Sequence, residues 1–154
     1  MQIREQAVQD AVDIFSHLTA REKTIFLAAT KRVSPVMIPV SVFHTNLSTL
    51  QAVVYYLKHH LHLSTSNIAS SLHRKPSTIS MTYRAASAKL KGKMNVSDTS
   101  FTIPLTIFME RSCAPLEALI LFFKETHYLK LVEIADLLHK NRNTIKSTHG
   151  RYKK

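Results

Sequence analysis

The sequence predicts an all-α protein made of two tandem three-helix modules that follow a short N-terminal pair of helices. Only 2 of the 154 residues are glycine, which is few for a turn-rich β fold, and 45% are hydrophobic, which suffices for a packed core. The chain also repeats itself. The basic pattern NIASSLHRKPSTISMTYRAA returns near the C-terminus as EIADLLHKNRNTIKSTHGRY.

The two copies align at an almost constant spacing. IPVSVF at residues 38–43 recurs as IPLTIF at residues 103–108, an offset of 65. One inserted residue raises the offset to 66, which then holds to the end of the repeat. Pairs that are identical at that offset include Ile68 with Ile134 and Thr78 with Thr144. The chain therefore carries an internal duplication.

Residues 1–37 precede the duplication and predict the helical pair. Thr19, followed three residues later by Glu22, forms a capping box that opens the second helix. The charge of this segment is close to neutral, which suits packing on the first module or self-association. Apolar residues recur at helical spacing in the first helix, at Val8, Ala11, Val12 and Phe15.

The first helix of each module has a recognisable start. Ser48 and Gln51 form a capping box in the first copy. Pro115 in the second copy fits the first turn, where a proline is tolerated. The buried stripe of the first copy is expected to contain Leu50, Val53, Val54, Leu57 and Leu61.

A short second helix and a longer third helix complete each module. The second helix turns Ile68, Ala69 and Leu72 inward, and the equivalent residues are Ile134, Ala135 and Leu138. The third helix is expected to begin at Ser77 or Asn143, which are both good N-caps. Its buried stripe would be Ile79, Tyr83, Ala86 and Leu90 in one copy, and Ile145, His149 and Tyr152 in the other.

These boundaries predict a first module over residues 38–92, a linker over 93–102 and a second module over 103–154. The linker is polar, and we expect it to be flexible. Each module opens on the short apolar pattern IP-x-x-x-F, whose proline favours an extended chain. We expect this lead-in to pack as a brace on its own module, although a recruited partner could use it instead.

A short helix with a small alanine, a tight turn and a helix that starts Thr-Ile is the helix-turn-helix pattern. Here the chain resembles region 4 of bacterial sigma factors over about residues 47–91 and 113–154. The resemblance implies a transcription-related DNA-binding module, although the turns lack the glycine usual in that family. It is carried by Ile68-Ala69, Leu72, Thr78-Ile79-Ser80 and Arg84-Ala85, with Lys89 and Lys91, and by Glu133-Ile134-Ala135, Leu138, Thr144-Ile145-Lys146-Ser147 and Arg151.

The charge of the chain favours a polyanionic partner. The formal net charge is +11, and residues 47–94 contain seven Lys and Arg residues but no Asp or Glu. The excess follows the duplicated pattern, so double-stranded DNA is the expected partner. If the two third helices lie about 34 Å apart, they can read successive major grooves of one duplex. RNA is less favoured, because the aromatic residues fall mostly on apolar stripes.

The free face of each third helix supplies the predicted contacts. Residues at the helix starts would hold phosphates, and Arg, Lys and Asn would read base edges. The first copy has fewer such readers and is expected to act mainly as a backbone clamp. The predicted DNA-binding residues are Lys75, Ser77, Thr78, Ser80, Met81, Arg84, Lys140, Arg142, Asn143, Thr144, Lys146, Ser147 and Arg151.

No enzyme, cofactor or metal site is predicted. His59, His60 and His62 diverge around a helix, so they are not expected to converge on one ion. The single cysteine, Cys113, excludes an intramolecular disulfide and fits a reducing compartment, and its position at a helix start could lower its pKa. No apolar run is long enough to cross a bilayer. The expected location is the cytoplasm, on the nucleoid if the cell is prokaryotic.

Three functions remain open from the sequence. The first is a transcriptional regulator that uses two recognition helices in the major groove. The second is an architectural protein that coats or bends DNA with low specificity. The third is a helical adaptor that binds a protein such as RNA polymerase. Direct base readout by Arg142, Asn143 and Lys146 distinguishes the first from the second.

Overall fold

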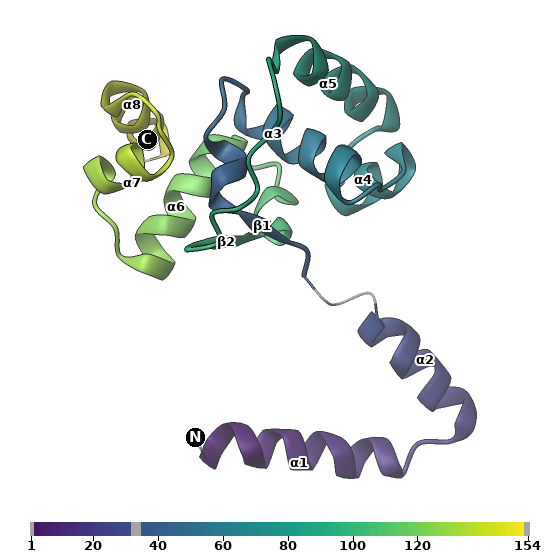
Figure 1. Cartoon of the computed structure of the whole chain (residues 1–154). Helices are drawn as coiled ribbons and strands as arrows, with labels where there is room; N and C mark the ends of the chain where they lie inside the picture. Colours follow the sequence, from purple (N-terminus) through teal and green to yellow (C-terminus); the bar gives the residue numbers. More distant parts are fainter. Residues whose placement is uncertain (1, 32–34, 153–154) are drawn as a thin grey trace. The chain divides into compact units, whose positions relative to one another are not determined.

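The computed structural model describes residues 2–31 and 35–152 and confirms an all-α protein (Figure 1). The chain divides into two compact units, residues 1–35 and 36–154. The first unit consists of α1 (Gln2–Ser16) and α2 (Ala20–Lys31). The Phe15 and Phe26 rings lie 5.4 Å apart between these helices. The predicted capping box is confirmed, since Thr19 N–H donates to Glu22 and Glu22 N–H donates to the Thr19 hydroxyl.

The second unit holds both copies of the duplication. The first copy contains β1 (Met37–Pro39), the 3₁₀ helix η1 (Val40–Phe43), α3 (Thr49–Tyr55), the π-helical turn η2 (Tyr56–His60), α4 (Thr65–Ser71) and α5 (Pro76–Lys89). The second contains β2 (Thr102–Pro104), the 3₁₀ helix η3 (Leu105–Phe108), α6 (Pro115–His127), α7 (Leu131–Leu137) and α8 (Arg142–Tyr152). In each copy the third helix packs on the first two.

Local signals explain where most helices begin. Ser48 and Gln51 form the predicted capping box, and Pro115 occupies the first turn of α6. The third helices begin earlier than predicted. Lys75 is the N-cap of α5 because Pro76 fits the first helical position, and the Asn141 side chain accepts the Asn143 N–H ahead of α8.

The turns of the two copies share an unusual backbone. His73 and His139, at equivalent positions after α4 and α7, both have φ of +50°. His62 and Tyr128 form a second equivalent pair, with φ of +53° and +55°. Left-handed backbone is the conformation for which proteins usually choose glycine. Here histidine occupies this backbone conformation in both turns.

The predicted inward residues of the second helices are confirmed. Ile68, Ala69 and Leu72, with their equivalents Ile134, Ala135 and Leu138, are all buried. On the third helices Ile79, Ala86 and Ile145 are buried, while Tyr83, Leu90 and His149 are partly buried and Thr148 is buried in addition. The side chain of Tyr152 lies outside the described residues. Leu61 was predicted to be buried, but it is 39% exposed because α3 widens into η2 before reaching it.

The two lead-ins pair with each other. β1 and β2 form an antiparallel ribbon in which Ile38 faces Ile103, and both side chains are fully buried. Beyond the strands, the ring centroids of Phe43 and Phe108 lie 6.2 Å apart, and α3 contacts α6. Each lead-in also packs on its own module as expected, since η1 contacts α3 and η3 contacts α6, but the pairing of the two lead-ins was not predicted. The ribbon joins the modules, which share one hydrophobic core.

The connector between the copies also differs from the flexible linker that its polar sequence predicts. Met94 is buried, and the Ser41 hydroxyl, itself buried, accepts the Asp98 N–H at 3.3 Å. These contacts fasten the connector to η1. Residues 93–102 thus separate two copies of a sequence, but they do not separate two independently packed bodies.

Gly150 provides a simple test of helix energetics in α8. A Cβ built at this residue meets nothing within 4 Å, and the backbone is helical. We expect Gly150→Ala to stabilise the second unit by up to about 1 kcal/mol, because alanine restricts the unfolded chain without a clash. Thermal unfolding followed by circular dichroism would measure the shift, and a lower midpoint would contradict the prediction.

Candidate nucleic-acid interface

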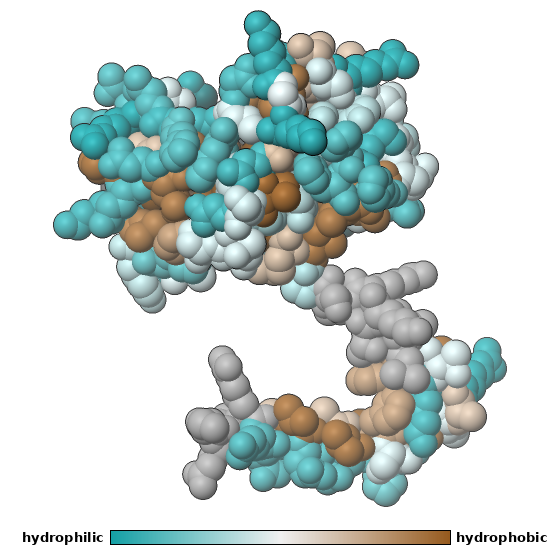
Figure 2. Space-filling view, viewed as in Figure 1, coloured by the Kyte–Doolittle hydropathy of each residue, from teal (hydrophilic) through white to brown (hydrophobic). Residues whose placement is uncertain are grey.

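α5 and α8 lie on the same side of the second unit, opposite the β1–β2 ribbon (Figure 1). Ile79 of α5 and Ile145 of α8 are buried in the core and hold the two helices on it. The opposite faces of both helices are turned toward solvent. Hydrophilic side chains cover this side in Figure 2. A duplex that crosses this side could meet both third helices at once.

The structure leaves most of the predicted contact residues accessible. Met81 is 71% exposed, although it is apolar, and Ser80 is only partly exposed. The exposed members of the predicted set are Lys75, Ser77, Thr78, Met81, Arg84, Arg142, Asn143, Thr144, Lys146, Ser147 and Arg151. Seven of these are polar or charged residues within the first two turns of α5 or α8.

One of the exposed basic residues already has an acidic neighbour. Arg142 contacts Asp136 at the end of α7 at 3.3 Å, and both side chains are more than 60% exposed. An ion pair this exposed to solvent contributes little to stability. The guanidinium can therefore leave Asp136 for a phosphate or a base at small cost.

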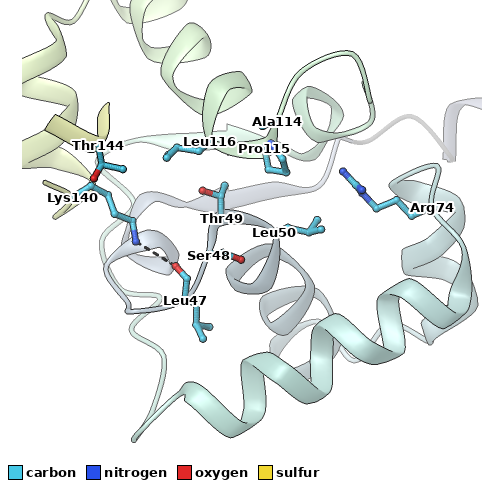
Figure 3. Close-up of a pocket in the computed structure, with 10 residues that line it drawn as sticks. All are labelled: Leu47, Ser48, Thr49, Leu50, Arg74, Ala114, Pro115, Leu116, Lys140 and Thr144. Carbon is cyan, nitrogen blue, oxygen red and sulfur yellow. Dashed lines mark hydrogen bonds between the residues drawn. The ribbon is translucent and has the colours of Figure 1, made fainter. Parts of the chain in front are cut away.

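Lys140 differs from the other predicted contact residues, because its side chain is half-buried and turned into the junction between the copies, and its role in DNA binding stays a prediction. Its Nζ donates to the carbonyl oxygens of Thr45 at 3.0 Å and Leu47 at 3.3 Å, so it ties the α7–α8 turn to the loop before α3 (Figure 3). Burial lowers the pKa of its ammonium group. The sequence shows that residue 140 is basic, but only the packing of the two copies determines which groups its side chain contacts.

Arg74, the equivalent residue of the first copy, also reaches the region between the two copies. In Figure 3 its side chain extends toward Pro115 at the start of α6. Arg74 and Lys140 line one cavity of about 400 Å³ together with the first residues of α3 and α6. Each turn thus contributes a basic side chain to this cavity. The Arg74 Nε is buried with no hydrogen-bond partner among the described residues.

A stacked pair of histidines reinforces the same junction. The His44 and His139 rings lie parallel, with centroids 3.9 Å apart, and the His44 Nε2 donates to the Leu137 carbonyl at 2.7 Å. In the sequence, His139 is distinguished only by its equivalence to His73 at the offset of 66. Its partner comes from the other copy, so no local pattern could have identified the contact.

Lys140→Met is expected to destabilise the second unit by about 1–3 kcal/mol, because two carbonyl oxygens lose a charged donor. Lys146→Met, the matched control on exposed surface, should leave stability within about 0.5 kcal/mol. Urea unfolding of both variants measures the difference. Equal midpoints would show that the Lys140 contacts contribute nothing.

Cys113 and the histidines around η2 are the other reactive side chains that the sequence singles out. Burial raises the pKa of the Cys113 thiol, and Glu117 and Glu110 add to the effect, so the expectation of a lowered pKa is wrong. His59 and His60 stack on Tyr55 and Tyr56 respectively, and their rings are nearly perpendicular to each other. Among residues 2–31 and 35–152, no three His, Cys, Asp or Glu side chains gather in a way that could hold a metal ion.

The fold and the surface define the chain as an all-α protein with two joined three-helix modules and a largely polar, basic face on the third helices. In comparisons with family models, curated proteins and solved structures, nothing matches the chain. The likeness to sigma region 4 thus remains a prediction from the sequence. In the described part of the chain, no helix has the length and apolar character to span a membrane.

Proposed function

We propose that this protein is a double-stranded DNA-binding transcriptional regulator that inserts α5 and α8 into the major groove. The observation that carries the proposal is the pair of third helices, which share one side of the second unit and carry exposed polar and basic residues. The formal net charge of +11 supplies long-range attraction to the phosphate backbone.

The residues divide into two roles under this proposal. Those in the first turns, Ser77, Thr78 and Thr144, lie where helix N-termini favour phosphate oxygens. Arg84, Asn143 and Lys146 are exposed and chemically suited to base edges, since Arg and Lys pair with guanine and Asn pairs with adenine. Phosphate contacts would set the position on the duplex, and base contacts would set the sequence.

Fluorescence anisotropy on a random pool of ~30-bp duplexes across a salt series tests the proposal, followed by sequencing of the retained fraction. We expect a steep dependence on salt together with an enriched motif. A steep dependence without any motif would favour an architectural protein that coats or bends DNA. No binding at low salt would reject both DNA-binding functions and favour the adaptor that binds a protein such as RNA polymerase.

We further propose that the first unit mediates self-association, with the protein in the cytoplasm or on a nucleoid. Val8, Val12 and Phe26 are exposed around a groove of about 340 Å³ between α1 and α2. Two short helices cannot bury these side chains by themselves. Analytical ultracentrifugation should show that the double variant Val8→Ser with Val12→Ser has a lower molecular mass in solution than the wild type. The control variant Gln6→Ser with Gln9→Ser changes exposed polar residues of α1 and should keep the mass of the wild type.

A further inference from the structure

The β1–β2 ribbon fixes how the two modules are related in space. Equivalent residues, Ile38 and Ile103, face each other across antiparallel strands. Two flanking hydrogen bonds are also equivalent: Val40 N–H donates to Phe101 at 3.0 Å, and Leu105 N–H donates to Val36 at 2.8 Å. A translation would place equivalent strands parallel. Antiparallel pairing of the same residues instead requires an approximate two-fold rotation.

Contacts away from the ribbon follow the same rotation. Phe43 lies against its equivalent Phe108, and α3 contacts its equivalent α6. Arg74 and Lys140 approach the start of the opposite first helix from the two sides of one cavity. The axis therefore runs from the ribbon, between α3 and α6, toward the side on which α5 and α8 lie (Figure 1). Both third helices are reached from that side.

We infer that the DNA target of this protein contains two half-sites in inverted orientation, with unequal sequences. The inference rests on the proposed function and extends it to the symmetry of the target. A two-fold-related pair of helices meets the two strands of a duplex in opposite directions, so the half-sites are inverted. A direct repeat would need modules that are related by a translation along the duplex.

The half-sites are unequal because the two exposed faces differ at equivalent positions. Arg84 of α5 corresponds to Gly150 of α8, and Ser80 corresponds to Lys146. Ser77 corresponds to Asn143, and Met81 corresponds to Ser147. A homodimer must present the same face twice. The duplicated chain presents two different faces with the symmetry of a dimer, so the target is a broken palindrome.

A variant that copies one face onto the other tests the symmetry directly. Pro76→Arg, Ser77→Asn, Ser80→Lys, Met81→Ser, Arg84→Gly and Ala85→Arg together give α5 the residues that α8 carries at the equivalent positions. The reverse variant, Arg142→Pro, Asn143→Ser, Lys146→Ser, Ser147→Met, Gly150→Arg and Arg151→Ala, keeps the test available if the first one folds poorly. Circular dichroism checks the fold of each, and selection from the random duplex pool reports the motif.

We expect the wild type to select two different inverted half-sites, with centres about 10 bp apart or a multiple of that spacing. Each face-copy variant should select a perfect palindrome. Selection of a direct repeat, or of one isolated half-site, would overturn the inference while leaving the DNA-binding function intact. A wild type that binds without any enriched motif would instead reject the proposed site-specific function, and the inference would fall with it.

Discussion

Removal of three positive charges from the third helices should weaken DNA binding at least about 100-fold at moderate salt. The variant combines Arg84→Ala, Arg142→Ala and Lys146→Ala, which are all exposed and all lie in α5 or α8. Each positive charge lost from the contact with the duplex should also reduce the salt dependence by up to about one unit of slope in log–log form, because fewer counterions are released. Anisotropy titrations with one selected duplex across a salt series measure both effects.

A charge-matched control separates local contacts from the overall field of the protein. Arg21→Ala, Lys93→Ala and Arg111→Ala also remove three positive charges, from exposed residues outside α5 and α8. We expect this variant to lose less than about 10-fold in affinity, because it keeps the proposed contact residues. Equal losses in both variants would show that summed charge alone holds the DNA. That result would favour the architectural function.

The second large effect concerns stability. Phe108→Ala should cost about 3–5 kcal/mol, because the ring is 1% exposed and packs against Phe43 at the junction of the copies. Both modules should lose stability together, since they share one core. Amide hydrogen exchange should therefore accelerate by about 100-fold or more at both Ile68 and Ile134.

Phe26→Ala is the matched control for that experiment, because this ring is 44% exposed and belongs to the first unit. It should leave exchange at Ile68 and Ile134 unchanged. If Phe108→Ala accelerated exchange at Ile134 alone, the copies would be independent domains. The shared core would then contribute nothing to their common stability.

The sequence predicted the helices and their inner faces because those depend on local signals. The capping boxes at Ser48 and Thr19, and the buried residues of α4 and α7, follow from spacing within one turn or two. The duplication made the assignments within the modules more secure, since the inward residues of α4 recur in α7. The predicted helix starts at Ser77 and Asn143 were slightly late. Pro76 takes the first helical position of α5, and the Asn141 side chain accepts the Asn143 N–H ahead of α8.

The contacts between the copies could not be predicted in the same way. Strands of three residues, such as β1 and β2, carry too little pattern to show that they pair across 65 positions. Lys140 and Lys146 are both lysines of the second copy and look alike in the sequence. Lys140 is nevertheless turned into the junction between the copies, whereas Lys146 is exposed. Such differences depend on where the other copy lies, and the sequence of one module does not contain that information.

The ribbon that joins the modules also affects how occupancy of a DNA target would depend on protein concentration. Two-fold DNA-binding proteins made of separate subunits must first associate, so their occupancy of a target rises with about the square of subunit concentration when dimers are scarce. Here the second three-helix module is held beside the first by one continuous chain and one core. If the second unit binds DNA as proposed, its occupancy should rise in direct proportion to the amount of protein, even at low copy number.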